Sequence, residues 1–396
     1  MPVSKNQFIG IETFFFIFFL ILTVFFFSYR FPAYIDDPLL VFHAKYLKYA
    51  ALIATFLIVI EAQYVLNSVI RNQKQIIEQQ NTELKRQKEE ILRQKEEIQA
   101  QRDLAQKQYE IIAEQKKHIT DSIIYASTIQ RALLPEYIDL LKDYEYFIFF
   151  RPKEIVSGDF YWFYKKGGRL FVAAADCTGH GVPGAFVSML GMTYLNDIMA
   201  KSPDDIMPHQ ILEQIRERII RTFTKKNGDE PKDGMDIAIY VIEPDRKTLH
   251  FAGANNPLYI IRKNENNNFP AEDKRIKLTS TKKYTLIHLK ADKMPVGKFQ
   301  TLKPFTLLTI NILPDDRLYV FSDGYIDQIG GNLGRRFGSA QFKKLLLSIQ
   351  DLSMQEQKSV LNQTLEQWIH QNPKLDIGQL DDILVLGIKI PETTGA

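Results

Sequence analysis

Cysteine is the residue that this 396-residue sequence has least of. Its single cysteine, Cys177, excludes an intramolecular disulfide framework and a cysteine-rich zinc site. A lone thiol is typical of a reducing compartment, so we expect the bulk of the chain in the cytoplasm. A strong excess of one charge is also absent, because 50 Lys and Arg face 47 Asp and Glu and the net charge is +3. The chain therefore lacks the basic footprint of a nucleic-acid-binding protein, and we expect no nucleic-acid partner.

Glycine and proline are absent from about Asn67 to His118, a polar tract in which RQKEEI occurs at 86–91 and again at 93–98. The period is seven, with an apolar residue at one seam position and, in most repeats, a glutamine three residues later. This pattern predicts a coiled-coil linker over 67–120 that joins two chains into a homodimer, with polar seam positions that let the coil shift. The apolar seam positions are Ile77, Leu84, Ile91, Ile98, Ala105, Ile112 and Ile119. The alternative is a solvated single helix that serves only as a spacer.

Charge is scarce in two stretches near the N-terminus. The stretch 9–29 contains one charged residue, and 49–66 is apolar except for Glu61. Both approach the roughly 20 apolar residues that cross a bilayer, so we expect two transmembrane helices in a membrane anchor over 1–66. A cleaved signal peptide is the alternative for the first stretch, but no small-residue cleavage site follows it. Basic residues outside the spans favour cytoplasmic termini, which predicts a multi-pass protein of the cell inner (cytoplasmic) membrane.

The pattern changes after Pro135 to short β-branched and aromatic runs with amphipathic helices between them. Predicted strands are Tyr146–Arg151, Phe160–Tyr164, Leu170–Ala175, Ile237–Ile242, Thr248–Ala252, Leu258–Ile261, Arg317–Ser322 and Ile383–Ile390. Predicted helices are Ala185–Met199, Pro208–Thr224, Ser339–Ile349 and Met354–His370. Strands outnumber helices, which predicts an α+β domain with mainly antiparallel sheets over 121–392, followed by a tail at 393–396.

Aspartates stand where these predicted strands begin or end. LFVAAAD ends at Asp176 and LYVFSD ends at Asp323, while Asp159 lies in IVSGDFYWF and the pair Asp381 and Asp382 precedes the last strand. Carboxylates at strand ends can converge on one edge of a sheet, and they are the hard oxygen ligands that Mg²⁺ or Mn²⁺ requires. One such aspartate alone is as well explained by a turn. Four such positions together indicate a shared metal site.

Six segments resemble, in order and spacing, the motif series of the SpoIIE/RsbU-type branch of the protein phosphatase 2C (PPM) family. They are FRPKEIVSGDFYW (150–162), ADCTGHGVPGAF (175–186), DGMDIAIYVI (233–242), FAGANNPLYII (251–261), FSDGYIDQIGG (321–331) and LDDILVLGIKI (380–390). The resemblance covers roughly 120–392. It implies an αββα sandwich, two antiparallel sheets flanked by helices, preceded here by the transmembrane helices and the long coiled coil.

The resemblance also implies a centre of two divalent metal ions, Mn²⁺ or Mg²⁺. Asp176 would bridge the two ions, and the backbone carbonyl of Cys177 would bind one of them. Asp323 and Asp381 would hold the other ion, with Asp159 in contact directly or through water. Such ions lower the pKa of a water molecule and orient it for in-line attack on phosphorus.

Four further residues are weaker candidates for this site. Asp382 is the alternative to Asp381 as the ligand in the acidic pair. His180 is a candidate general acid, although a histidine in a turn needs no function. Arg151 and Lys153 are the cations nearest the first acidic motif that could contact a substrate phosphate.

The resemblance implies a metal-dependent protein serine/threonine phosphatase in bacterial signal transduction, with its catalytic domain in the cytoplasm. The expected partner is a phosphoserine or phosphothreonine protein, such as a STAS-type anti-sigma-factor antagonist. The alternative is a non-catalytic, membrane-tethered scaffold with a phosphatase-like domain, but a scaffold does not need a cluster of mutually repelling carboxylates. A sensor kinase built around His118 would need a glycine-rich ATP lid and an asparagine box, which do not follow it.

Overall fold

The computed structural model describes residues 16, 18, 19, 37–134, 138–224, 234–266, 273–374 and 377–391. The chain divides into two compact units, Met1–Ile112 and Ala113–Ala396. The predicted span 9–29 lies outside the described residues except for three helical phenylalanines, and the predicted tail 393–396 lies outside them entirely.

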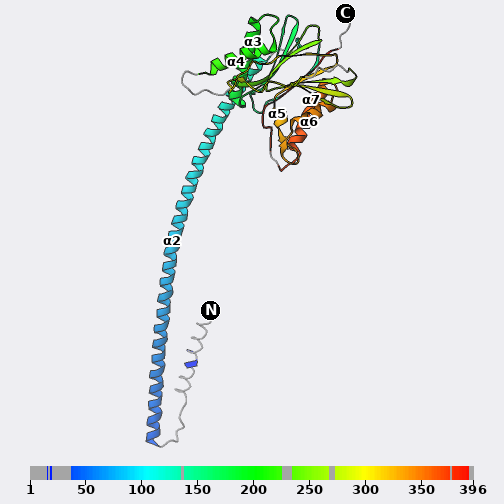
Figure 1. The fold of residues 1–396 in the computed structure, drawn as a ribbon. Coiled ribbons are helices and arrows are strands. Elements are labelled where there is room, and N and C mark those ends of the chain that lie inside the picture. The colour runs from blue at the N-terminus through cyan, green and yellow to red at the C-terminus, as the bar shows by residue number, and fades with distance from the viewer. Residues whose placement is uncertain are drawn as a thin grey trace. The chain divides into compact units, whose positions relative to one another are not determined.

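Helix α2 (Pro38–Leu133) continues without a break for 96 residues (Figure 1). The sequence has no glycine and no proline between Pro38 and Pro135, so nothing in this stretch interrupts the backbone hydrogen bonds. Pro38 stands at the first helical position, where its missing N–H costs nothing, and the helix ends two residues before Pro135. The predicted span 49–66 and the predicted linker 67–120 are therefore parts of one helix.

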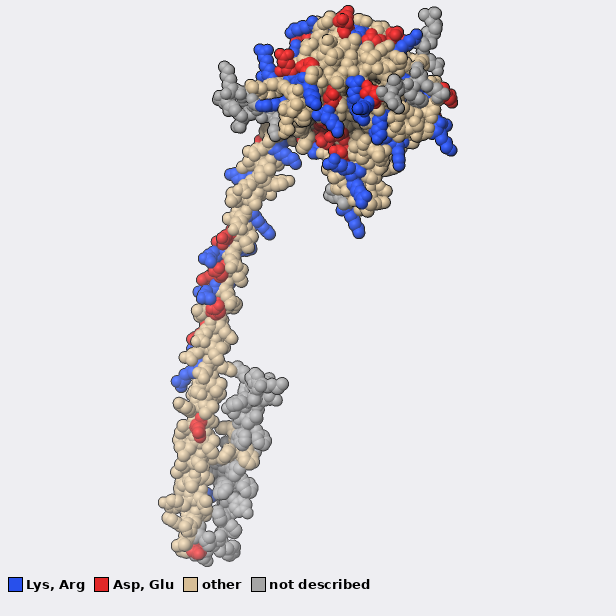
Figure 2. Space-filling model, viewed as in Figure 1, with Lys and Arg blue, Asp and Glu red and all other residues tan. Residues whose placement is uncertain are grey.

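The N-terminal part of α2 exposes a dense set of apolar side chains, including Leu52, Ile53 and Phe56. Figure 2 shows this part with few charges and the middle part with charges of both signs. Among the described residues, α2 is the one helix whose length and composition would let it cross a membrane. The apolar seam of the heptads is also exposed in the single chain, and its pairing with a second chain stays a prediction.

The second unit is built on two six-stranded antiparallel sheets. The first sheet has the order β1-β14-β11-β6-β8-β7, and the second has β10-β5-β4-β3-β2 with β9 paired to β4. Strands of the first sheet are β1 (Glu145–Arg151), β6 (Leu258–Lys263), β7 (Ile276–Ser280), β8 (Tyr284–Leu289), β11 (Arg317–Phe321) and β14 (Ile383–Lys389). Strands of the second sheet are β2 (Phe160–Lys166), β3 (Arg169–Cys177), β4 (Gly234–Ile242), β5 (Thr248–Ala254), β9 (Val296–Gly297) and β10 (Leu308–Asn311).

Helices cover the outer face of each sheet (Figure 1). The second sheet packs against α3 (Gly181–Lys201) and α4 (Pro208–Phe223), and the first packs against α6 (Ser339–Ser348) and α7 (Met354–His370). A third apolar core lies between the two sheets. The layers are therefore helix, sheet, sheet, helix, and the prediction of an α+β fold with antiparallel sheets and outer helices is confirmed.

Strand β3 shows why its sequence reads as an unbroken apolar run. Phe171, Ala173 and Ala175 point into the core with α3 and α4, whereas Val172 and Ala174 point into the core between the sheets. Both faces of the strand are buried, so the usual alternation of apolar and polar residues is absent. The run ends where the strand reaches the edge of the sandwich, at Asp176.

All eight predicted strands and all four predicted helices overlap observed elements. Sequence reasoning missed β7 to β10 and the hairpin of β12 (Ile329–Gly330) and β13 (Arg335–Arg336), together with the single-turn helix α5 (Gly324–Asp327). Three of these strands have only two residues, too few to show a period of two.

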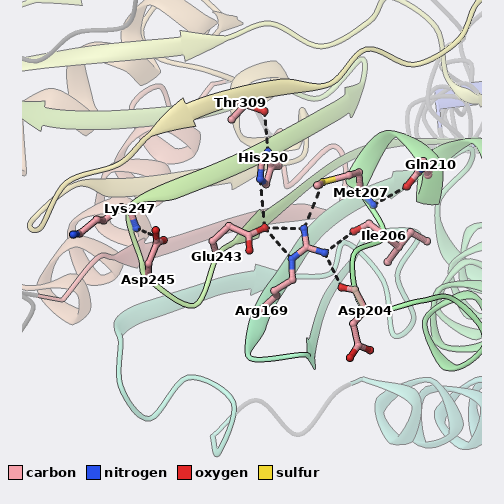
Figure 3. A network of polar contacts seen from close by, with 10 residues as sticks. All are labelled: Arg169, Asp204, Ile206, Met207, Gln210, Glu243, Asp245, Lys247, His250 and Thr309. Carbon is pink, nitrogen blue, oxygen red and sulfur yellow. Dashed lines mark hydrogen bonds and ion pairs between the residues drawn. The ribbon is translucent and has the colours of Figure 1, made fainter.

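A polar network anchors the α3–α4 connection to the second sheet (Figure 3). The Arg169 guanidinium donates to Glu243 Oε1 at 2.9 Å and to the carbonyls of Asp204 and Ile206 at 2.8 and 2.9 Å. Arg169 stands at the opposite end of β3 from Asp176, roughly 23 Å away at about 3.3 Å per residue. This network therefore supports the fold at the end of the sandwich remote from the acidic cluster.

His288 on β8 makes the fold sensitive to acid. Burial, with Lys343, Lys290 and Lys277 nearby, lowers its pKa to about 4. Between pH 6.5 and 4 the unfolded chain therefore binds a proton that the folded chain excludes, so this stabilisation is complete above pH 6.5 and is lost as the pH falls through that range. The unfolding free energy of the wild type should fall between pH 7 and pH 4.5, and in His288→Gln this fall should be smaller by about 1–2 kcal/mol, a figure that allows for the partial exposure of the side chain. Denaturant titrations at the two pH values measure the difference. The exposed His118→Gln is the control, and an equal pH slope in the His288 variant and the wild type would contradict the assignment.

Candidate metal centre

Carboxylates from both sheets meet at one end of the sandwich. Asp176 is the penultimate residue of β3, and Asp323 follows β11 as the residue before α5. Asp159 directly precedes β2, and Asp381 lies two residues before β14. Asp176 is close enough to Asp159, Asp323 and Asp381 for each of these negative charges to raise its pKa. The structure thus brings together the four aspartates that the sequence analysis singled out as ligands.

Asp159 is the most enclosed member of this cluster. Its side chain is 2 % exposed, and its Oδ2 atom has no hydrogen-bond partner among the described residues. Burial raises its pKa well above the ordinary range, and the nearby charges of Asp382, Asp381 and Asp323 raise it further against a hydrogen bond from Ser322. A buried carboxylate oxygen without a donor is costly, so a cation at this position would lower the free energy of the folded protein.

Burial and neighbouring carboxylates also raise the pKa values of Asp176 and Asp323. Burial, followed by the charge of Asp159, raises the pKa of Asp176 to about 10. The pKa of Asp323 is raised by desolvation first, then by Asp327 and Asp381, although this side chain is exposed to solvent. Cations bound at the cluster would oppose both shifts, because each carboxylate would then gain a neutralising neighbour.

The two members of the acidic pair have different surroundings. Asp382 is buried, and its Oδ1 and Oδ2 atoms accept hydrogen bonds from the backbone amides of Lys153 and Gly158, each at 2.7 Å. Asp381 is exposed, and its Oδ1 atom accepts from the Asp382 amide at 2.9 Å. Asp382 is thus occupied in holding the loop that carries Asp159.

Glycines allow this loop and the turn after β3 to touch. A Cβ atom on Gly184 would lie 2.1 Å from the carbonyl oxygen of Gly179, and one on Gly158 would lie 2.7 Å from the same oxygen. Gly179 itself has a φ of +86°. Only glycine fits these contacts, so the backbone after Asp176 passes directly beside the Asp159 loop.

Cys177 has a buried thiol and a backbone carbonyl oxygen that lies near the acidic cluster. The side chain is 3 % exposed in the core, and burial raises the pKa of the thiol well above its ordinary value. A buried thiol with a raised pKa is a poor nucleophile. Its carbonyl oxygen lies against Gly158, 3.2 Å from where a Cβ atom would be, at the edge of the acidic cluster.

His180, Arg151 and Lys153, the weaker candidates for the site, make hydrogen bonds or ion pairs with other residues of the fold. His180 precedes α3, is exposed, and has its Nδ1 atom 2.8 Å from Glu154 Oε1. Arg151 forms an ion pair with Glu366 on α7. Lys153 has its backbone amide bound to Asp382, as described above. The structure thus gives Arg151 a partner in the fold.

Sequence reasoning missed two charged residues at this end of the sandwich. Asp236 on β4 lies directly opposite Asp176 in the strand register, and Asn255 Nδ2 donates to its Oδ1 atom at 2.8 Å. Burial raises the pKa of Asp236, and the charge of Asp323 adds to this. Arg336 on β13 pairs with Asp327 at 3.1 Å, and its charge lowers the pKa of Asp323. Asp236 was detectable, since it stands before an apolar run as Asp381 does.

The donor set suits a hard divalent cation. All the converging side chains are carboxylates, and the enclosed Asp159 oxygen has no other partner in the described chain. Within the described ranges, no three His, Cys, Asp or Glu side chains are arranged to hold an ion by themselves. Mg²⁺ keeps several water ligands and takes only one or two carboxylates, so these residues fit such an ion with water completing its coordination.

Comparison with solved structures defines the class of the fold. The SiaA-PP2C domain of Pseudomonas aeruginosa is 28% identical with a TM-score of 0.56, and the match covers 69% of this chain and 98% of that domain. The PP2C domain of SpoIIE from Bacillus subtilis, solved with a fragment of its regulatory domain, is 16% identical with a TM-score of 0.46, covering 64% and 63%. The catalytic domain of the serine/threonine phosphatase PstP, in complex with 2 manganese ions, is 13% identical with a TM-score of 0.43, covering 63% and 99%. The likeness to the SiaA-PP2C domain shows that the fold is that of PP2C-type phosphatase domains.

The family follows from the sequence model of stage II sporulation protein E (SpoIIE), which matches residues 166–391. This match spans more than half of the chain, so the chain belongs to the SpoIIE family. A search of curated proteins found no match.

Proposed function

We propose that this protein is a metal-dependent protein serine/threonine phosphatase that is anchored in the membrane by its N-terminal segment. The observation that carries the proposal is the buried Oδ2 atom of Asp159, which has no hydrogen-bond partner among the described residues and lies within a cluster of carboxylates. A fold gains nothing from such a cluster by itself, because each added carboxylate raises the electrostatic free energy of the others. Divalent cations would remove that cost.

Each residue of the cluster has a role in this proposal. Asp176, Asp323 and Asp381 would be the main ligands of two Mn²⁺ or Mg²⁺ ions, and Asp159 and the Cys177 carbonyl would complete the protein ligands. The hydrogen bonds of Asp382 to the loop amides support Asp381 as the ligand of the pair. Bound divalent ions would acidify a water molecule and neutralise charge on a transferring phosphoryl group.

Substrate recognition is expected to depend on a partner protein. Arg151 is already paired with Glu366, which leaves Arg336 as the described cation whose charge reaches Asp323. We propose a phosphoserine or phosphothreonine protein as the substrate, with a small STAS-type regulator as the class that family membership favours. The exposed apolar part of α2 supports membrane anchoring, and its exposed heptad seam supports a homodimer with the second unit in the cytoplasm.

The test is hydrolysis of p-nitrophenyl phosphate and of a phosphoserine protein by the full chain in detergent, with Mn²⁺ and with EDTA. We expect turnover that requires Mn²⁺ and falls by about 10²-fold or more in Asp323→Asn, the scale of losing one preorganised charged group. The matched control is Asp327→Asn, an acidic residue of the neighbouring turn that pairs with Arg336. It should retain most of the activity.

A non-catalytic scaffold is the competing function. It predicts a folded protein that binds a phosphoprotein but shows no metal-dependent turnover on either substrate. That result, with the wild type and both variants equally inactive, would overturn the phosphatase proposal.

A further inference from the structure

The last turns of α2 bury one long polar side chain against the Asp159 loop. Gln130 Nε2 donates to the Ser157 carbonyl at 2.6 Å and to Ser188 Oγ at 2.8 Å. Gln130 Oε1 accepts from the Ser157 amide at 3.2 Å. The side-chain amide thus binds both backbone groups of Ser157 and also a residue of α3.

This burial is exceptional within α2. Gln130 and Ser127, each 7 % exposed, are the two buried residues among the α2 side chains that the structure describes. Burying a polar amide is unfavourable unless its donors and acceptors are satisfied, and at Gln130 they are. The contact therefore fixes one orientation of the helix end against the loop.

Ser157 connects Gln130 to Asp159, the proposed metal ligand, through a further hydrogen bond. Ser157 Oγ accepts a hydrogen bond from the Asp159 amide at 3.0 Å, so the residue that Gln130 holds also holds Asp159. From the other side, Asp382 binds the Gly158 amide. Because Ser188 lies on α3, which begins five residues after Asp176, Gln130 also links the two ligand-bearing segments of the second sheet.

We propose that Gln130 is a positioning residue of the metal centre, which holds the Asp159 loop in the orientation that binds a divalent cation. The inference rests on the proposed function in one respect, namely that Asp159 binds the metal. Residues that orient metal ligands typically contribute 10–100-fold to metal affinity. Gln130 orients Asp159 through hydrogen bonds that a side chain of the same length without an amide cannot make.

The experiment compares Mn²⁺ binding by the full chain in detergent, measured by titration calorimetry, for wild type, Gln130→Met and Arg131→Met. Methionine keeps the length of Gln130 and removes its hydrogen bonds, while Arg131 is exposed on the same turn. We expect Gln130→Met to weaken Mn²⁺ binding by about 10-fold or more. Arg131→Met should bind as the wild type does. For each protein we also record the thermal unfolding midpoint without metal and the rise of that midpoint on adding Mn²⁺. If Gln130 had a purely structural role, Gln130→Met would lower the metal-free midpoint but would leave the rise caused by Mn²⁺ unchanged.

A milder variant covers the case in which Gln130→Met does not fold. Ser188→Ala removes one of the three groups bonded to the Gln130 amide and should weaken Mn²⁺ binding by a smaller factor. Equal Mn²⁺ affinity in the wild type and in the folded variants would overturn the role of Gln130 and leave the phosphatase proposal intact. Absence of Mn²⁺ binding by the wild type would instead overturn the metal centre, and with it both proposals.

Discussion

Asp176→Asn is expected to abolish metal-dependent turnover and, at the same time, to stabilise the metal-free protein. Burial, followed by the charge of Asp159, raises the pKa of Asp176, so the metal-free protein must take up a proton at this position when it folds at neutral pH. Asparagine keeps the shape and cannot ionise, so the variant folds without taking up this proton. We expect a loss of activity of about 10²–10³-fold or more, together with a rise of several degrees in the metal-free unfolding midpoint, since about 1 kcal/mol moves it by about 2–4 °C.

The pH dependence of this stabilisation provides a second check. With a folded-state pKa of about 10 against an ordinary value of 3.8, the folded protein retains a proton on Asp176 that the unfolded chain releases. The unfolding free energy of metal-free wild type therefore falls as the pH rises from about 4 towards 10, and Asp176→Asn should flatten that slope. The exposed Asp245→Asn at the remote end of the sandwich is the control. A lower midpoint for Asp176→Asn without metal would contradict the electrostatic account.

Arg262→Met is expected to cause a large loss of stability while leaving the acidic cluster intact. Arg262 and Asp316 have side chains that are 1 % and 0 % exposed and are joined at 2.6 Å. Arg262 also donates to the Asn311 carbonyl at 2.8 Å. Burial already raises the pKa of Asp316, and removing the cation leaves this buried carboxylate without its partner. We therefore expect the unfolding free energy to fall by about 3–5 kcal/mol in denaturant titrations.

The adjacent residue of the same strand offers a matched control. Lys263 pairs with Asp315 at 2.9 Å, but its side chain is 40 % exposed. Lys263→Met should therefore cost at most about 1 kcal/mol. The double variant Arg262→Met with Asp316→Leu should recover much of the loss, because it leaves no unpaired charge. Equal effects of the two single variants would show that burial does not set the strength of the Arg262 pair.

The acidic cluster was largely predictable because its members mark the limits of strands. Where an apolar run stops at an aspartate, as at Asp176 and Asp323, the sequence indicates that a buried strand has reached the edge of the sandwich. Asp236 was missed although it stands directly before an apolar run, as Asp381 does. In an antiparallel pair the beginning of one strand lies beside the end of its neighbour, which is why Asp236 lies opposite Asp176.

Local pattern was sufficient for the eight strands and four helices that were predicted and for the motifs, because burial on one face or both, turn residues and strand ends are each visible within about ten residues of sequence. Partner choice was not visible, since it depends on residues far apart in the chain. Asp382 holds a loop more than 220 residues away from it, Arg151 pairs with Glu366, and Gln130 binds Ser157 and Ser188. Such contacts exist only once the sheets have packed, because a hydrogen bond needs its two atoms within about 3 Å and no local period encodes that distance.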